Sequence, residues 1–225
     1  MKKTTGTIIA RDTYTGRNMG GIERGAIKKL LIMELLPIPV GFSGGMEPVS
    51  WGGTFFLRRI LGTVPVEEDG SIHAQVPAMR ALQLVALDED NFSVKRMLSF
   101  LTVMPGEVNA CIGCHEERTT VVPNAPKTQA LQRPPSRITA ISDMPEIFDY
   151  PRDIQPIWDR YCLDCHDVHT RDGGVVLTDD QGPIYTHSYF ALSQRLQMAD
   201  GRIHKHGNYP PYSIGSSASL KTSIL

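Results

Sequence analysis

Residues 111–115 read Cys111-Ile112-Gly113-Cys114-His115, and residues 162–166 repeat the pattern as Cys162-Leu163-Asp164-Cys165-His166. Both stretches are C-x-x-C-H, the attachment signature of a c-type haem. Two thiols at this spacing can form thioethers with the two vinyl groups of one porphyrin, and the histidine that comes next is then held under the iron. The two motifs use all four cysteines of the chain. The sequence therefore predicts two covalently attached haems, with His115 and His166 as iron ligands.

Three other roles exist for paired cysteines. A four-cysteine zinc site also uses C-x-x-C pairs, but zinc gives no reason for a histidine after each pair. Redox dithiols of the thioredoxin type follow a strand in a βαβ pattern, which this sequence lacks. Two disulfides are the third alternative.

Composition and charge narrow the class of protein. The chain has 225 residues, a hydrophobic fraction of 41% and a charged fraction of 21%, which are ordinary values for a globular protein. Its net charge of −1 provides no long-range attraction to nucleic acid or to anionic lipid. No apolar run approaches the roughly 18 residues that a membrane-spanning helix needs.

The site of haem attachment predicts an extracytoplasmic location, in the periplasm or an equivalent bacterial compartment. Met1-Lys2-Lys3 resembles the basic start of a signal peptide, but no apolar stretch of the needed length comes after it. We therefore expect that a signal has been removed or that the chain is a fragment of a longer protein, and the fragment is the favoured interpretation.

The pattern between residues 6 and 103 is that of short strands with a turn about every ten residues, which favours an antiparallel sandwich. The segments concerned are 6–14, 27–36, 54–57, 60–66, 71–77, 81–87 and 94–103. His73 lies inside this pattern and is interpreted as a rim or surface histidine. The last strand leads into the first haem motif, so we expect that haem at the edge of the sandwich.

Residues 119–146 contain five prolines and many polar side chains, and this composition predicts a surface linker. After it, Asp153 is a candidate helix cap, and Ile154, Ile157, Trp158 and Tyr161 share one face of a short helix that ends at Cys162. A second helix is predicted over residues 188–198. This order is typical of a cytochrome c-like module.

The fold prediction is thus α+β in three parts. Residues 1–118 form a β-sandwich-like domain with the first haem at its edge, residues 119–146 form the linker, and residues 147–225 form a small, mostly helical cytochrome c-like domain.

Several segments resemble the hydrazine synthase alpha subunit family. Residues 42–55, 61–66 and 104–107 together with the first motif are similar to the family's haem-bearing middle domain. Residues 151–157 together with the second motif, 187–190 and 209–215 are similar to its C-terminal haem domain. The resemblance implies a bacterial extracytoplasmic multihaem protein with redox partner proteins or subunits.

The iron ligands decide what each haem does, because an iron with two protein ligands transfers electrons and one with an open position can bind a small molecule. For the second haem, His187 is the first candidate as a sixth ligand, with His204 and His206 as alternatives. His169 is too close in sequence to His166. For the first haem, the family's tyrosine ligand is replaced by Thr119, which cannot bind iron as an anion.

The predicted function is therefore a dihaem c-type cytochrome module for extracytoplasmic electron transfer. The alternative is a catalytic redox domain acting on a small nitrogen compound at a five-coordinate first haem. A binding or structural domain with accessory haems is the third interpretation.

The first testable prediction concerns covalent attachment. Protein expressed with haem c maturation should keep two haems per chain after denaturation, because thioethers survive unfolding. Replacing Cys111 with Ala should leave the second haem intact, since the motifs lie in different predicted domains. Intact mass and the haem spectrum of the denatured protein measure both results. A mass unchanged by maturation, or bound zinc, would contradict the prediction.

Overall fold

The computed structural model separates the chain into two compact units with a boundary after Met144. Among the described residues, the first unit contains those up to 35 and 59–144, and the second contains those from 145 onward together with 36, 37, 57 and 58. The described residues are 3–16, 19, 21–37, 57–97, 99–114, 119, 128–183 and 185–194.

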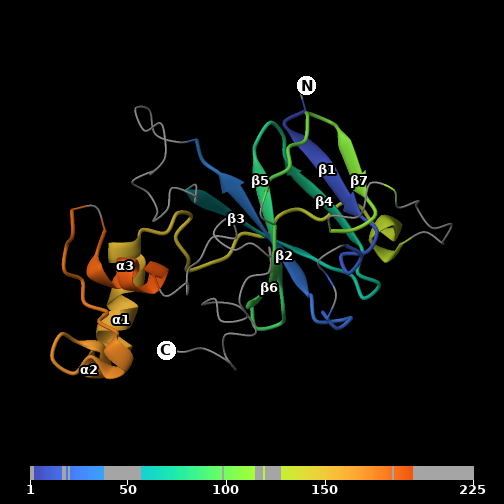
Figure 1. The fold of residues 1–225 in the computed structure, drawn as a ribbon. Helices are drawn as coiled ribbons and strands as arrows, with labels where there is room; N and C mark the ends of the chain where they lie inside the picture. The colour runs from blue at the N-terminus through green and yellow to red at the C-terminus, as the bar shows by residue number, and fades with distance from the viewer. Residues whose placement is uncertain are drawn as a thin grey trace. The chain divides into compact units, whose positions relative to one another are not determined.

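The first unit is built from two sheets (Figure 1). One has the strand order β4-β1-β7, with β1 at Thr5–Ala10, β4 at Ile72–Pro77 and β7 at Val108–Cys111. The other has the order β3-β2-β5-β6, with β2 at Lys29–Leu35, β3 at Arg58–Pro65, β5 at Leu82–Leu87 and β6 at Ser93–Arg96. The prediction of a β-rich domain is confirmed.

One apolar cluster joins the two sheets. The strand β1 buries every second residue, as the period of two of a half-buried strand requires. The buried members from the strands of both sheets are Ile8, Ala10, Leu30, Ile32, Val64, Ile72, Ala74, Val76, Leu82 and Ala86. Because both sheets contribute to the same cluster, they pack face to face as a sandwich.

The strand β7 departs from the predicted antiparallel arrangement. It pairs with β1 in parallel, with Ala10 opposite Cys111, whereas β4 pairs with β1 antiparallel. The alternation of side chains shows which segments are strands but carries no information about strand direction. A parallel partner has to arrive by a long connection, and here residues 11–107 separate the two strands.

Residues 128–144, which we call the strap, lie along the other edges of the sandwich. Ser136 exchanges backbone hydrogen bonds of 2.8 Å with Gln75 and His73 of β4. Thr139 exchanges two of 2.9 Å with Thr63 of β3. The strap therefore continues both sheets and covers edge groups that would otherwise be unpaired. The sequence predicts a surface linker over 119–146, and its proline-rich composition carries no information about which backbone groups pair at a sheet edge.

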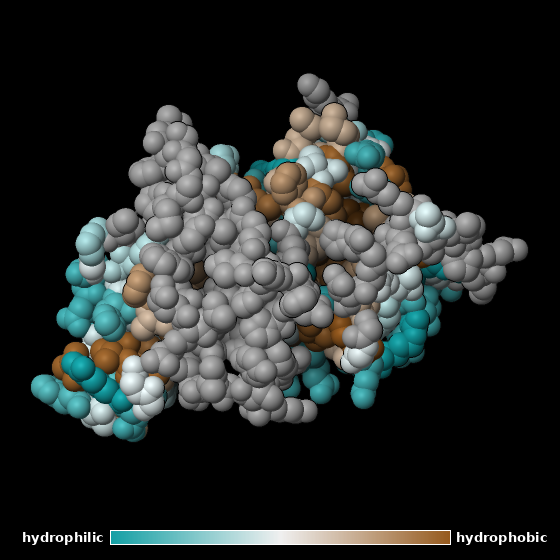
Figure 2. Space-filling model, viewed as in Figure 1, coloured by the Kyte–Doolittle hydropathy of each residue, from teal (hydrophilic) through white to brown (hydrophobic). Residues whose placement is uncertain are grey.

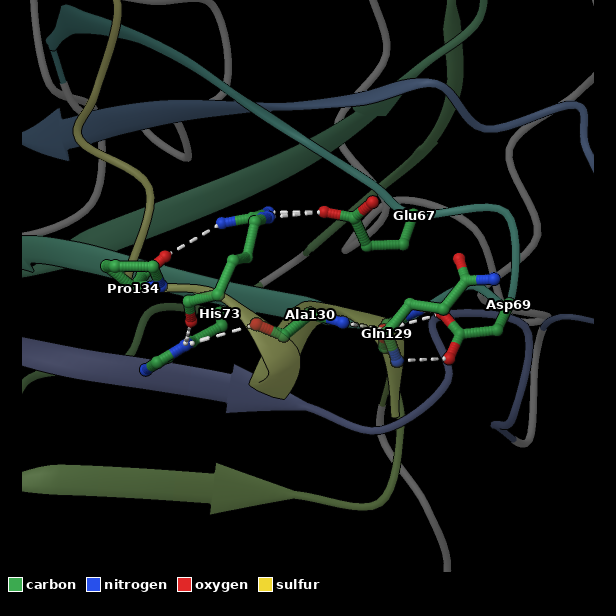
Figure 3. Close-up of polar contacts among 8 residues, drawn as sticks. Glu67, Asp69, His73, Gln129, Ala130 and Pro134 are labelled. Carbon is green, nitrogen blue, oxygen red and sulfur yellow. Dashed lines mark hydrogen bonds and ion pairs between the residues drawn. The ribbon is translucent and has the colours of Figure 1, made fainter. Parts of the chain in front are cut away.

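Side chains hold the start of the strap on β4 (Figure 3). The short helix η1, Gln129–Gln132, buries Ala130 completely. The Asp69 carboxylate accepts hydrogen bonds from the backbone N–H groups of Ser71 at 3.0 Å and Gln129 at 2.8 Å. Burial by itself would raise the pKa of Asp69, but the hydrogen bonds from Ser71 and Gln129 together outweigh it, so the pKa is lowered. The Arg133 guanidinium also forms an ion pair with Glu67.

The second unit is small and mostly helical where it is described (Figure 1). It contains η2 at Tyr150–Ile154, α1 at Gln155–Tyr161, α2 at Leu163–His166, η3 at Asp172–Gly174 and α3 at His187–Gln194. Its buried apolar residues are Val175, Leu177 and Leu192, which pack against Tyr150, Trp158, Cys162 and Leu163. Among the described residues, no helix is long and apolar enough to cross a bilayer.

The predicted helix before the second motif is confirmed, but its start differs. Asp149, not Asp153, is the cap residue, and its carboxylate accepts from the N–H of Arg152 at 3.1 Å. The Asp153 carboxylate in turn accepts from the N–H of Asp149 at 2.7 Å. The two aspartates thus provide acceptors for two backbone N–H groups at the start of the helix. Either aspartate can cap a helix by its chemistry, and only the backbone path selects the earlier one.

Gly62 tests the importance of the strap. Its φ of 131° is available only to glycine at low cost, and a Cβ there would lie 2.1 Å from the backbone oxygen of Thr139. We expect Gly62→Ala to lower the free energy of unfolding by ~2–4 kcal/mol in urea titrations.

Gly21 is the matched control, because its φ is 83° and no atom lies within 4 Å of its Cβ position. Gly21→Ala should cost only ~1 kcal/mol, from the left-handed backbone alone. Equal losses in the two variants would show that contact with the strap adds nothing to stability.

Candidate haem attachment sites

The first cysteine pair begins at the end of an edge strand. Cys111 is the last residue of β7, and its Sγ lies 3.8 Å from the side-chain oxygen of Asn109. Cys111 and Cys114 are both half-buried, and Cys114 packs against the apolar cluster of the sandwich. The parallel pairing of β7 with β1 thus carries the pair to the sheet edge.

A turn formed by residues 12–16 contacts the backbone of the first motif. The N–H groups of Arg11 and Asp12 donate to the carbonyl oxygens of Cys111 and Ile112, both at 3.0 Å. A Cβ at Gly113 would lie 2.0 Å from the carbonyl oxygen of Thr15, so only glycine fits between the two segments. Gly113 is buried as a result. No sequence pattern indicates this contact, since the turn and the motif are far apart along the chain.

The second cysteine pair lies where two short helices meet. Cys162 follows α1, and its carbonyl oxygen accepts from the N–H groups of Cys165 at 3.2 Å and His166 at 2.9 Å. Cys162 is half-buried and Cys165 is exposed. The motif is therefore held by local helical hydrogen bonds, in contrast to the first.

His166 has a buried polar atom without a partner. Its Nδ1 is buried and makes no hydrogen bond to any described residue. A buried ring nitrogen without a partner is uncommon, because its desolvation is not compensated. The backbone of His166 is better satisfied, since its carbonyl oxygen accepts from Leu177 N–H at 2.9 Å.

A buried polar network connects the helix before the second motif to α3. The Gln155 amide donates to the carbonyl oxygen of Leu177 at 2.9 Å and to the Asp159 carboxylate at 2.8 Å. The Ser188 hydroxyl donates to the amide oxygen of Gln155. Gln155 and Ser188 are both buried, and sequence reasoning missed them. A polar residue on the core side of a short helix is the signal that could have indicated Gln155.

An aromatic group packs beside the same motif. The Trp158 indole N–H donates to the Tyr150 hydroxyl at 2.9 Å, and the Tyr150 ring meets the Tyr189 ring edge-on at 5.1 Å between centroids. Burial raises the pKa of Tyr150. Trp158 and Cys162 belong to the same small apolar cluster, so these aromatic side chains pack beside the second cysteine pair.

The histidines predicted as iron ligands differ in how far the structure describes them. His115, His204 and His206 lie outside the described residues. His187 is the first residue of α3 and is exposed, and its N–H donates to the carbonyl oxygen of Asp180 at 2.9 Å. Its role as a sixth ligand stays a prediction.

His73 is half-buried on β4, as a rim residue would be. Its Nδ1 lies 3.3 Å from the carbonyl oxygen of Ala130 and 3.2 Å from that of Arg133, both in the strap (Figure 3). In the sheet, His73 of β4 lies opposite Ile9 of β1, which lies opposite Ala110 of β7. Cys111 is the next residue along β7. The two side chains therefore face opposite sides of their sheet.

The cysteines offer thiols rather than a closed metal cage. All four are free. Among the described residues, no three His, Cys, Asp or Glu side chains form a group that could hold a metal ion. A haem brings four nitrogen ligands of its own and needs only one or two from the protein. The two thiols and one histidine of each motif match what a covalently attached haem requires of the protein.

Residues 25–116 match the family model for the hydrazine synthase alpha subunit middle domain, and the first motif lies inside this match. The resemblance to the hydrazine synthase alpha subunit is confirmed. A chain of Kuenenia stuttgartiensis hydrazine synthase is similar in structure, with a TM-score of 0.67 and 22% sequence identity over 84% of the present chain. The match covers 33% of the Kuenenia chain, so the present chain spans about a third of its length. No curated protein sequence matches.

The pKa of the Cys162 thiol gives a test of the second pair in protein without haem. Burial raises this pKa, and the neighbouring Cys165 raises it further by charge repulsion. A raised pKa leaves less thiolate at a given pH, so alkylation of Cys162 should reach its half-maximal rate at a higher pH than that of an unfolded cysteine peptide.

The two causes can be separated with Cys165→Ser. This variant should lower the midpoint for Cys162 but leave it above the peptide value, because burial is the larger cause. Rates are measured by mass spectrometry of the Cys162 peptide. A midpoint at or below the peptide value would contradict burial of this thiol.

Proposed function

We propose that this chain is a dihaem c-type cytochrome module that transfers electrons outside the cytoplasm. Cys111 and Cys114 would attach one haem, and Cys162 and Cys165 would attach the other. His115 and His166 would bind the two irons. The observation that carries the proposal is the pair of C-x-x-C-H motifs, each beginning at the end of a secondary-structure element.

The second unit has two features that fit a haem. The first is the buried Nδ1 of His166, which has no partner among the described residues. The second is apolar surface beside the motif: Tyr161 is 70% exposed, and Ile157 and Val168 are exposed as well. Figure 2 shows such apolar side chains at the surface over α1 and α2. A porphyrin is a large apolar plate, and it would cover surface of this kind.

Each haem would supply an iron that gains and loses one electron. The chain's own residues would set how exposed that iron is and which partner can approach it. The matching family model describes a domain of an enzyme subunit. We therefore propose that redox partner proteins or further subunits receive the electrons. The net charge of −1 gives no attraction to nucleic acid.

A specific observation favours the alternative at the first haem, a five-coordinate iron that acts on a small nitrogen compound. In the first unit, His73 is the one described histidine, and it faces the opposite side of the sheet from Cys111. Its Nδ1 also lies against the strap. The described residues of this unit therefore offer no second histidine to that iron.

Carbon monoxide binding separates the two functions. In the full chain matured with haem c and reduced, we expect CO to bind one haem of two, because the first iron has an open position and the second does not. Visible difference spectra give the stoichiometry. No CO binding would leave electron transfer and remove the enzymatic alternative, and absence of covalent haem would refute both.

The ligand of the second haem is tested by His187→Ala, which should raise CO binding to two per chain. His169→Ala is the matched control, since His169 is also exposed but stands too close to His166 to reach the other face of the same porphyrin. It should leave the value at one. CO at both haems in the unaltered chain would show that His187 is not the ligand.

A further inference from the structure

The first C-x-x-C pair packs against a turn near the N-terminal end of the first unit, about 100 residues earlier in the sequence. The turn formed by residues 12–16 contacts the motif twice without an intervening side chain. A Cβ at Gly16 would lie 1.8 Å from the carbonyl oxygen of Cys114, and one at Gly113 would lie 2.7 Å from that of Asp12. Two backbone segments so close cannot shift independently.

The Asp12 carboxylate organises this turn. It accepts a hydrogen bond from the N–H of Tyr14 at 3.0 Å and from the hydroxyl of Thr15 at 3.2 Å. It also forms an ion pair with Arg24. Asp12 itself is largely shielded, with 18% of its side chain exposed. One side chain therefore determines the path of the segment that touches Gly113.

The rest of the sandwich fixes the turn from two further directions. The N–H of Thr13 donates to the carbonyl oxygen of Gly70 at 2.8 Å. The Tyr14 hydroxyl accepts from the N–H groups of Gly25 at 2.9 Å and Ile27 at 2.8 Å. The turn is thus a rigid part of the unit, and the cysteine pair lies against it.

The second motif is supported differently. The residue that corresponds to Gly113 is Asp164, which is exposed, and the loop is closed by helical hydrogen bonds to the carbonyl oxygen of Cys162. The two motifs share the same sequence spacing of their cysteines but are held by different means. One uses local helix geometry and the other uses tertiary contact.

We propose that the Asp12–Gly16 turn sets the positions of the Cys111 and Cys114 thiols, with Asp12 as the positioning residue. The inference rests on the proposed function in that these thiols would hold a haem. It adds that the attachment geometry is determined before attachment by residues outside the motif. The turn and the first motif both belong to the first unit, so the effect is confined to the first haem.

The main experiment uses the full chain matured with haem c. Asp12→Ala and Gly113→Ala should each lower haem attachment at the first motif several-fold and shift the reduction potential of whatever haem attaches there. The second haem should be unchanged. Peptide mass spectrometry reports attachment at each motif, and a redox titration of the spectrum reports the potentials.

Matched controls separate positioning from loss of stability. Asp88 accepts comparable hydrogen bonds, from the N–H groups of Asp90 at 3.0 Å and Phe92 at 2.8 Å, in the turn between β5 and β6 of the other sheet. Asp88→Ala should destabilise the unit without shifting the first haem. Asp164→Ala places alanine at the position of the second motif that corresponds to Gly113, where the exposed site should tolerate it. If Asp88→Ala shifts the first haem as much as Asp12→Ala does, the proposal is wrong.

A conservative variant tests the mechanism. In Asp12→Asn the amide oxygen can stay in the place of Oδ1 and accept from the N–H of Tyr14. The amide nitrogen then stands in the place of Oδ2, so the variant loses the ion pair with Arg24 and the hydrogen bond accepted from the Thr15 hydroxyl. Asp12→Asn should therefore attach more haem at the first motif than Asp12→Ala, which loses every one of these contacts. Equal losses in the two variants would exclude the hydrogen bond from Tyr14 N–H as the cause.

A measurement without haem distinguishes failure of this proposal from failure of the proposed function. In glutathione buffers, two thiols and one oxidised glutathione give one disulfide and two reduced glutathiones. The equilibrium constant for Cys111–Cys114 should change at least about threefold in Asp12→Ala, while that for Cys162–Cys165 stays constant. Alkylation and mass spectrometry resolve the pairs. An unchanged constant overturns the positioning role, whether or not haem attaches.

Discussion

The first unit depends on the burial of one apolar cluster between two sheets. The alternation along β1 places Ile8 and Ala10 in this cluster, and a shift of one residue would expose them. This burial fixes the register of β1, and the register of β1 in turn fixes β4 on one side and β7 on the other. The place of Cys111 at the end of β7 results from that register.

The two edge strands of the three-stranded sheet, β4 and β7, have different neighbours. The edge at β4 is covered by the strap, which pairs through Ser136 and then continues to Thr139 at β3. The edge at β7 leads into the first cysteine pair. Since an edge strand has one side without a sheet neighbour, it can carry a bulky attached group without breaking the ladder of hydrogen bonds.

The second unit is organised by another principle. Its described apolar core is small, and buried polar groups hold it together instead. Gln155 links α1, the Leu177 backbone and Ser188, so the helix that leads into Cys162 is tied to the start of α3. Buried polar groups that are fully hydrogen-bonded define one arrangement more strictly than apolar contacts do. Such precision would be useful beside the redox group that we propose for the second motif, because small displacements would change its surroundings.

The sequence by itself determined the cysteine motifs, most strands and the helix before Cys162, because these depend on local spacing and alternation. It also determined the similarity to the hydrazine synthase alpha subunit. Only the tertiary structure decided the parallel pairing of β7, the packing of the strap and the contact between Gly113 and Thr15. These features join segments far apart in the chain through backbone atoms. Backbone groups are nearly the same in every residue, so the pattern of side chains in the sequence does not predict contacts between them.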